Sequence, residues 1–120
     1  MFSKRAIVVS TAARIGTKSA IKDITTTLLY WGVPSVITYG ISVQAMNWAG
    51  VADKKKEKIE KDTTRIAIKV LKRNRVKAGL KTKALFMMMR MMQKKDWGSG
   101  EAEKMHWDKN GWLGTERPWK

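Results

Sequence analysis

The sequence has 120 residues, and 25 Lys and Arg against 10 Asp and Glu give it a formal net charge of +15. A chain this short has room for one small domain, and its charge indicates an anionic partner such as nucleic acid, anionic lipid or an acidic protein surface. It has no cysteine, which excludes disulfides, iron–sulfur clusters and thiolate zinc sites, and its one histidine, His106, leaves only scattered carboxylates for a metal. No phosphate loop, dinucleotide motif, paired carboxylates or catalytic triad is recognisable. We therefore expect no enzyme, no cofactor and no metal.

The first segment, residues 1–22, is basic and contains no acidic residue. Its positive charges are Lys4, Arg5, Arg14, Lys18 and Lys22. Together with Ser, Thr and scattered apolar residues, this composition is typical of a mitochondrial transit peptide, retained here. A basic amphipathic helix resting on lipid headgroups fits the segment equally well.

The second segment, residues 23–52, contains no charged side chain between Asp23 and Asp53. A hydrocarbon core about 30 Å thick needs roughly 20 mainly apolar helical residues, so the segment is long enough to cross a bilayer. Trp31 and Trp48 lie where interfacial aromatic residues are expected. The sequence therefore predicts a single transmembrane helix over residues 23–52, with a buried helix of a water-soluble protein as the alternative.

One face of this predicted helix is small and weakly polar. Close backbone approach and interhelical hydrogen bonds drive helix association in lipid, so we expect this face to pack on neighbouring transmembrane helices. Its members are Trp31, Ser35, Thr38, Ser42, Ala45 and Ala49.

The third segment, residues 53–95, has the pattern of a basic amphipathic helical arm. Ile59, Ile66 and Val70 form a narrow apolar stripe, and Gly79 is the position at which such a helix is most easily broken. No acidic residue occurs from Thr63 to Lys95. The residues expected to contact anionic lipid or an acidic partner are Lys54, Lys55, Lys56, Lys69, Lys72, Arg73 and Arg75.

The last segment, residues 96–120, shows no helical or strand periodicity and is predicted to be irregular. Tryptophan recurs along it, and Trp is a favoured anchor at protein interfaces. We therefore expect an extended strap that is attached to a partner through Trp97, Trp107, Trp112 and Trp119. The alternative is that these tryptophans pack on one another in a small local cluster.

Taken together, these segments predict an all-α protein with one transmembrane helix, a long basic amphipathic helix, either continuous or broken near Gly79, and an irregular Trp-rich tail. In this layout the chain resembles the single-span accessory subunits of mitochondrial inner-membrane complexes. The resemblance implies a single-pass location in that membrane and a non-catalytic role in the assembly or stability of a respiratory-chain complex or the ATP synthase. It further implies contacts with other subunits and with an anionic phospholipid such as cardiolipin.

Two other functional classes remain open from the sequence. One is an organellar ribosomal protein or another nucleic-acid-binding protein that uses the basic helix of residues 63–95. The other is a peripheral membrane or import-related protein that acts alone.

Overall fold

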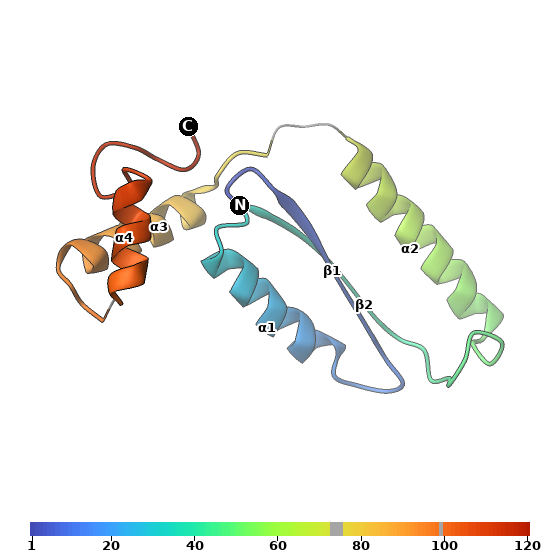
Figure 1. Ribbon diagram of the computed structural model, residues 1–120. Helices are drawn as coiled ribbons and strands as arrows, with labels where there is room; N and C mark the ends of the chain where they lie inside the picture. Colours follow the sequence, from blue (N-terminus) through green and yellow to red (C-terminus); the bar gives the residue numbers. More distant parts are fainter. Residues whose placement is uncertain (73–75, 99) are drawn as a thin grey trace.

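The structure is a computed structural model, and it describes residues 1–72, 76–98 and 100–120. Within these residues the chain forms two strands and four helices (Figure 1). Their order along the chain is β1 (Arg5–Ala12), α1 (Thr17–Tyr30), β2 (Ser35–Ser42), α2 (Asp53–Leu71), α3 (Leu80–Lys94) and α4 (Glu101–Lys109).

The first half of the chain is a β-α-β unit. β1 and β2 pair in parallel, with Ile7 opposite Ile37 and Val9 opposite Tyr39, and α1 is the crossover connection that parallel strands require. Both strands are rich in β-branched residues, which suit a pleated surface. The unit is therefore built from residues that favour strands, joined by a helix of 14 residues.

α1 packs on one face of the sheet, whereas α2 lies on the other side of the sheet and stands away from it (Figure 1). On the α1 side, a Cβ placed on Gly40 would lie 2.8 Å from Ile21, so glycine allows helix and strand to approach closely. On the other side, Ile59 and Ile66 of α2 face the sheet across a groove of about 580 Å³. We call this space the α2 groove.

The second half of the chain lies at the opposite end of the molecule from α2. There α3 and α4 pack together beside the end of α1 and the N-terminal residues (Figure 1). Phe2 joins the two halves, because its ring contacts Phe86 of α3 edge-on at a centroid distance of 5.9 Å.

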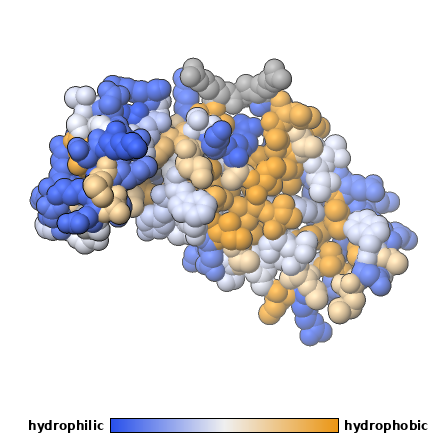
Figure 2. Space-filling model, in the orientation of Figure 1, coloured by the Kyte–Doolittle hydropathy of each residue, from blue (hydrophilic) through white to orange (hydrophobic). Residues whose placement is uncertain are grey.

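The molecule is elongated and has little interior. Its extents are 56 × 31 × 20 Å and its radius of gyration is 19.0 Å, whereas a compact chain of this length is expected to have a radius of about 14 Å. No residue of α1 or α2 is buried. Figure 2 shows hydrophobic side chains gathered on the visible surface, over the middle of the molecule.

The predicted transmembrane helix over residues 23–52 is wrong, and with it the all-α class. The segment contains the end of α1, a turn and all of β2. Gly32 adopts a left-handed conformation, with φ of 77°, and Pro34 directly precedes β2. These residues end the helix, and the β-branched side chains that follow favour a strand.

No helix in the described parts of the chain combines the length and the apolar character needed to cross a bilayer. The predicted location as a single-pass protein of the mitochondrial inner membrane is therefore overturned. The uncharged segment forms the end of α1, a turn, β2 and the loop that leads to α2.

The arm is helical with a break that ends at Gly79, where the sequence allowed one, whereas the predicted tail differs from the structure. The arm consists of two helices, since α2 ends at Leu71 and α3 begins directly after Gly79. The tail is not irregular throughout, because α4 occupies Glu101–Lys109. Glu101 and Glu103 lie in the first turn of α4, where negative charge is favourable.

Candidate functional site

The residues predicted to form a helix-packing face do not share one. Ser35, Thr38 and Ser42 lie in β2, Trp31 directly follows α1, and Ala45 and Ala49 lie between β2 and α2. Because side chains alternate along a strand, Ser35 lies on the opposite face of the sheet from the other two. The Ser42 hydroxyl donates a hydrogen bond to the carbonyl of Ala13 at 3.2 Å, so it stabilises the end of the sheet.

Of the residues predicted to contact an anionic partner, Lys54, Lys55, Lys56 and Lys69 lie in α2 and Lys72 directly follows it. Arg73 and Arg75 lie outside the described residues. Some of this charge is used within the chain. Lys55 donates to the carbonyl of Ser42, and Lys56 lies 3.5 Å from Asp53.

A further ion pair on α2 joins Lys58 and Asp62 at 2.7 Å. The hydrogen bond from Lys58 lowers the pKa of the Asp62 carboxyl. The same hydrogen bond and the charge of Asp62 raise the pKa of Lys58. Part of the basic arm is therefore neutralised locally.

The outer edge of β1 is the first candidate binding surface. The N–H of Val43 donates to the carbonyl of Ala12 at 2.9 Å, so the backbone groups of Ala12 face β2. Backbone groups of alternate strand residues face opposite sides of a parallel pair. Those of Ile7, Val9 and Thr11 therefore face away from β2. We call this row the β1 edge. Within the described chain the sheet contains no third strand.

The α2 groove beside this edge is open and apolar. The side chains of Ile7 and Val9 line it and are 45% and 59% exposed, although both lie on a sheet face. Tyr39 also lines it, and its hydroxyl is buried without a hydrogen-bond partner among the described residues. Burial raises the pKa of the Tyr39 hydroxyl, and the nearby charge of Asp62 adds to the effect.

An aromatic cluster holds the second half of the chain together. Phe86 stacks on Trp107 at a centroid distance of 4.9 Å and contacts Phe2, Trp112 and Trp119 edge-on. We call these five residues the aromatic cluster. Three of the four tryptophans predicted to anchor a partner thus contact Phe86 of the same chain. The fourth, Trp97, is 58% exposed, with the ammonium of Lys95 at 4.7 Å from its ring centroid.

Arg90 fixes the tail against α3. Its guanidinium donates to the carbonyls of Trp112 and Leu113 at 3.0 Å and to that of Gly114 at 2.7 Å. One side chain thus satisfies three consecutive carbonyls in the turn after α4. A special role for Arg90 could have been predicted from the sequence, because Arg90 is the one charged residue in the run from Phe86 to Met92.

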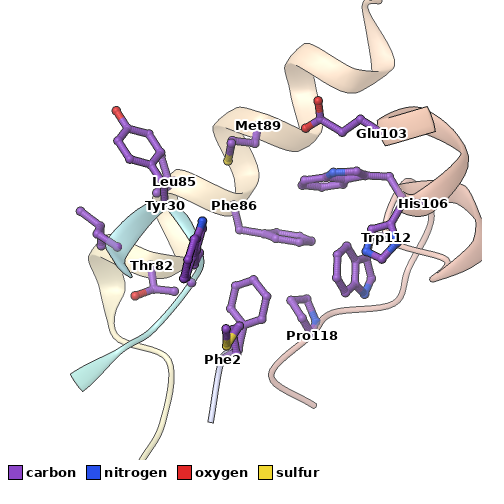
Figure 3. A pocket seen from close by; sticks show the side chains of 15 residues that line it. Phe2, Tyr30, Thr82, Leu85, Phe86, Met89, Glu103, His106, Trp112 and Pro118 are labelled. Atoms are coloured by element: carbon purple, nitrogen blue, oxygen red, sulfur yellow. The ribbon is translucent and has the colours of Figure 1, made fainter. Parts of the chain in front are cut away.

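A cavity of about 560 Å³, the aromatic pocket, opens between the aromatic cluster and the end of α1 (Figure 3). Phe86 and Trp107 are buried at its back, and Tyr30 and Trp31 are exposed at its rim. Glu103 and His106 reach it from α4. The sequence did not predict this pocket, because its walls come from separate parts of the chain.

The sequence matches no family model and none of the curated proteins, and the fold matches no solved structure. The likeness in layout to mitochondrial accessory subunits, and the prediction that the chain is not an enzyme, therefore stay predictions. In the described residues no group of three or more His, Asp or Glu side chains is placed to hold a metal ion.

Proposed function

We propose that this chain is an assembly subunit whose β1 edge pairs with a strand of an acidic protein partner. The observation that carries the proposal is a two-stranded parallel sheet whose β1 edge has no neighbouring strand among the residues that the structure describes. Addition of a strand to an exposed sheet edge is a common mode of protein recognition, because the backbone hydrogen bonds themselves supply affinity.

The physical argument begins with the sheet. Parallel sheets occur almost only where both faces are covered, and a pair of strands is marginal by itself in water. Here the helices on both faces bury none of their residues completely. A strand of the partner beside β1, together with the rest of the partner chain, would cover the exposed Ile7 and Val9 and close the α2 groove.

The β1 edge is favoured over the outer edge of β2 by the residues in each strand. β2 contains Gly40, a residue type that weakens the interior of a strand, and it directly follows Pro34, which has no backbone N–H to donate to a further strand. β1 contains neither and has an unbroken apolar run from Ala6 to Val9. Such a run is typical of an interior strand of a parallel sheet.

The charge of the chain supports an acidic partner. A formal net charge of +15 opposes the pairing of two copies of this chain and accelerates the encounter with a negatively charged protein. Arg5 already donates to the carbonyl of Lys69 at 2.7 Å, which ties the start of β1 to α2.

The test compares amide hydrogen exchange in the isolated full-length chain and in complexes recovered with it at low salt. In the isolated chain we expect fast exchange at Ile7, Val9 and Thr11 and slower exchange at Val8 and Ser10, whose amides face β2. In the complex all five should exchange slowly. Equal protection of both sets in the monomeric isolated chain would overturn the proposal.

A matched pair of substitutions distinguishes the contribution of the backbone to partner binding from that of the side chain. Val9→Pro removes one outward N–H, whereas Val9→Ala keeps it and shortens the same side chain. We expect Val9→Pro to abolish complex formation and Val9→Ala to weaken it only severalfold. Equal retention of the partner by both variants would contradict pairing at this edge.

A second candidate function is nucleic-acid binding, favoured by the absence of acidic residues from Thr63 through all of α3. Such binding would depend on phosphate contacts and would weaken steeply with salt. The slope of the logarithm of the binding constant against the logarithm of the salt concentration gives the number of these contacts. Titration of single-stranded and duplex RNA at two salt concentrations tests it. The break between α2 and α3 means that two helices, rather than one continuous helix, would carry the charge.

A further inference from the structure

One side of α3 is apolar although it is exposed to solvent. Successive residues of a helix are turned by about 100°, so residues three or four positions apart share a side. We call the exposed apolar row the methionine face, and its members are Leu80, Ala84, Met87, Met88 and Met91. The four large side chains among them are 45% to 85% exposed. The other side of α3 is the buried one, and Phe86 lies there in the aromatic cluster.

α3 is therefore apolar on two sides, of which one is covered by the described chain. A helix that is apolar all round is normally buried. Contiguous exposed apolar side chains on a protein surface mark an interaction site. The methionine face thus requires a covering surface that the described residues do not supply.

Lysines border the methionine face at both ends. Lys81 and Lys83 flank it in the first turn of α3, and Lys94 and Lys95 follow it at the end of the helix. All four are exposed, and within the described chain none of them forms an ion pair with a carboxylate. The sequence has no acidic residue between Lys81 and Lys95. The covering surface therefore meets an apolar row and positive charge together.

Trp97 is held at the same end of α3. Its backbone N–H donates to the carbonyl of Met92 at 3.1 Å. The side chain is exposed, and the ammonium of Lys95 lies 4.7 Å from the ring centroid. Tryptophan and lysine are both favoured at the depth of lipid headgroups, because each has an apolar body and a polar tip.

We infer that α3 lies in the surface of a membrane that contains anionic lipids, with the methionine face among the upper acyl chains and the four lysines at the headgroup phosphates. Basic amphipathic helices bind in the plane of the interface rather than across the bilayer. A protein partner fits this face less well, because lysine is depleted in protein interfaces. A second copy of the chain fits least, because it would bring the same lysines together. The β1 edge takes no part in this contact.

A label on the methionine face tests whether it enters the lipid. The chain has no cysteine, so Met91→Cys carries an environment-sensitive fluorophore at one defined place. The labelled full chain is added to vesicles of phosphatidylcholine and phosphatidylserine whose acyl chains carry a nitroxide quencher. We expect the emission to fall severalfold, because the label enters the acyl region.

The control for this label is Met105→Cys on α4, at a position that is 66% exposed. Met105 lies two residues from the buried Trp107 and therefore on the other side of α4. We expect its label to stay unquenched on the same vesicles. Equal quenching at the two positions, or none at Met91, would overturn the inference.

A matched pair of double variants tests the lysines. Lys81→Gln with Lys94→Gln should weaken binding to the same vesicles about 25-fold, since each lysine near an anionic leaflet contributes about fivefold. Lys18→Gln with Lys22→Gln changes the net charge equally at exposed positions of α1. It should weaken binding by about twofold at most, because distant charges are screened. Equal losses in the two variants would refute the placement of α3 at the headgroups.

A further double variant tests the methionines. Met87→Gln with Met91→Gln makes two apolar side chains polar at similar size and keeps every charge. It should weaken vesicle binding about tenfold, because less apolar surface is buried, whereas Met105→Gln should leave binding unchanged. All three positions are exposed, so the far-ultraviolet circular dichroism of the parent should be kept. Full binding by the double variant would show that charge alone holds the chain and would contradict insertion.

The same double methionine variant identifies the other possible occupants of the face. Self-association of the parent in sedimentation, lost in this variant, would assign the methionine face to a second copy. Loss of a protein complex with unchanged vesicle binding would assign the face to a protein partner. Either result would overturn the assignment to a membrane surface.

Discussion

The two halves of this molecule bury different kinds of side chain. In the β-α-β unit with α2, Val8 and Ile41 are buried, but Ile7 and Val9 stay exposed and the α2 groove separates strand from helix. In the second half, two helices and a short tail enclose Phe86 and Trp107 almost completely, at 3% and 7% exposure. The comparison teaches that a few aromatic side chains enclose an interior that aliphatic side chains on two strands form only in part.

The physical reason lies in the area that one residue covers. An aromatic side chain buries about 150–250 Å², so Phe86 and the four aromatic residues around it form an interior with little backbone. Valine and isoleucine on a strand bury less and depend on a second layer lying close above them. A pair of strands presents too narrow a surface for such a layer to settle, and α2 therefore stands away from the sheet.

The largest expected effect comes from a substitution of Phe86, which lies at the centre of the enclosed half. Phe86→Ala should lower the free energy of unfolding of the α3, α4 and tail region by about 3–5 kcal/mol, because it deletes a buried ring in contact with four others. Hydrogen exchange should show lost protection in α4 and unchanged protection in β1 and β2. Met88→Ala, at a position of α3 that is 48% exposed, is the control. Unchanged protection of α4 in Phe86→Ala would show that the cluster does not hold this half together.

A smaller effect of opposite sign is expected in the open half. Tyr39→Phe removes a buried hydroxyl that has no partner among the described residues. It should raise the free energy of unfolding by about 1 kcal/mol, since an unsatisfied buried polar group is destabilising. Denaturant unfolding monitored by circular dichroism measures the change. Tyr30→Phe, at an exposed position, should have no effect, and a destabilised Tyr39→Phe would mean that the hydroxyl does have a partner.

The smallest effect concerns the surface ion pair of α2. The pKa of Asp62 is lowered by the hydrogen bond from Lys58, so the folded helix favours the ionised carboxylate. Its contribution is present above the ordinary carboxyl pKa and is lost as the pH falls through the lowered value. Asp62→Asn should therefore reduce helicity slightly at neutral pH and not in strong acid. Glu60→Gln on the same helix serves as the control, and a difference from the parent that persisted in acid would contradict the ion-pair explanation.

The sequence predicted some parts of this fold because their signals are local. The amphipathic pattern that starts at Asp53 corresponds to α2, which begins at the same residue, and Gly79 directly precedes α3. The prediction from the uncharged segment was wrong because the absence of charge does not by itself distinguish a transmembrane helix from a β-branched strand. Gly32 and Pro34, followed by β-branched residues, carried the information that favoured a turn and a strand.

The candidate sites were less predictable than the elements that hold them. The tail tryptophans were identified as anchors, but their contact with Phe86 depends on two helices packing and has no local pattern. Glu103 and Trp31 both line the aromatic pocket, although they lie in distant parts of the chain. The β1 edge likewise becomes visible only when the pairing of β1 with β2 is known.

The place of Phe2 in the aromatic cluster has a consequence for how the molecule folds. Phe2 contacts Trp119, which lies near the other end of the sequence, at a centroid distance of 6.1 Å. A contact between such distant residues closes a loop of nearly the whole chain, which carries a high entropic cost and slows folding. During synthesis the Phe2 ring can make this contact only after Trp119 has left the ribosome.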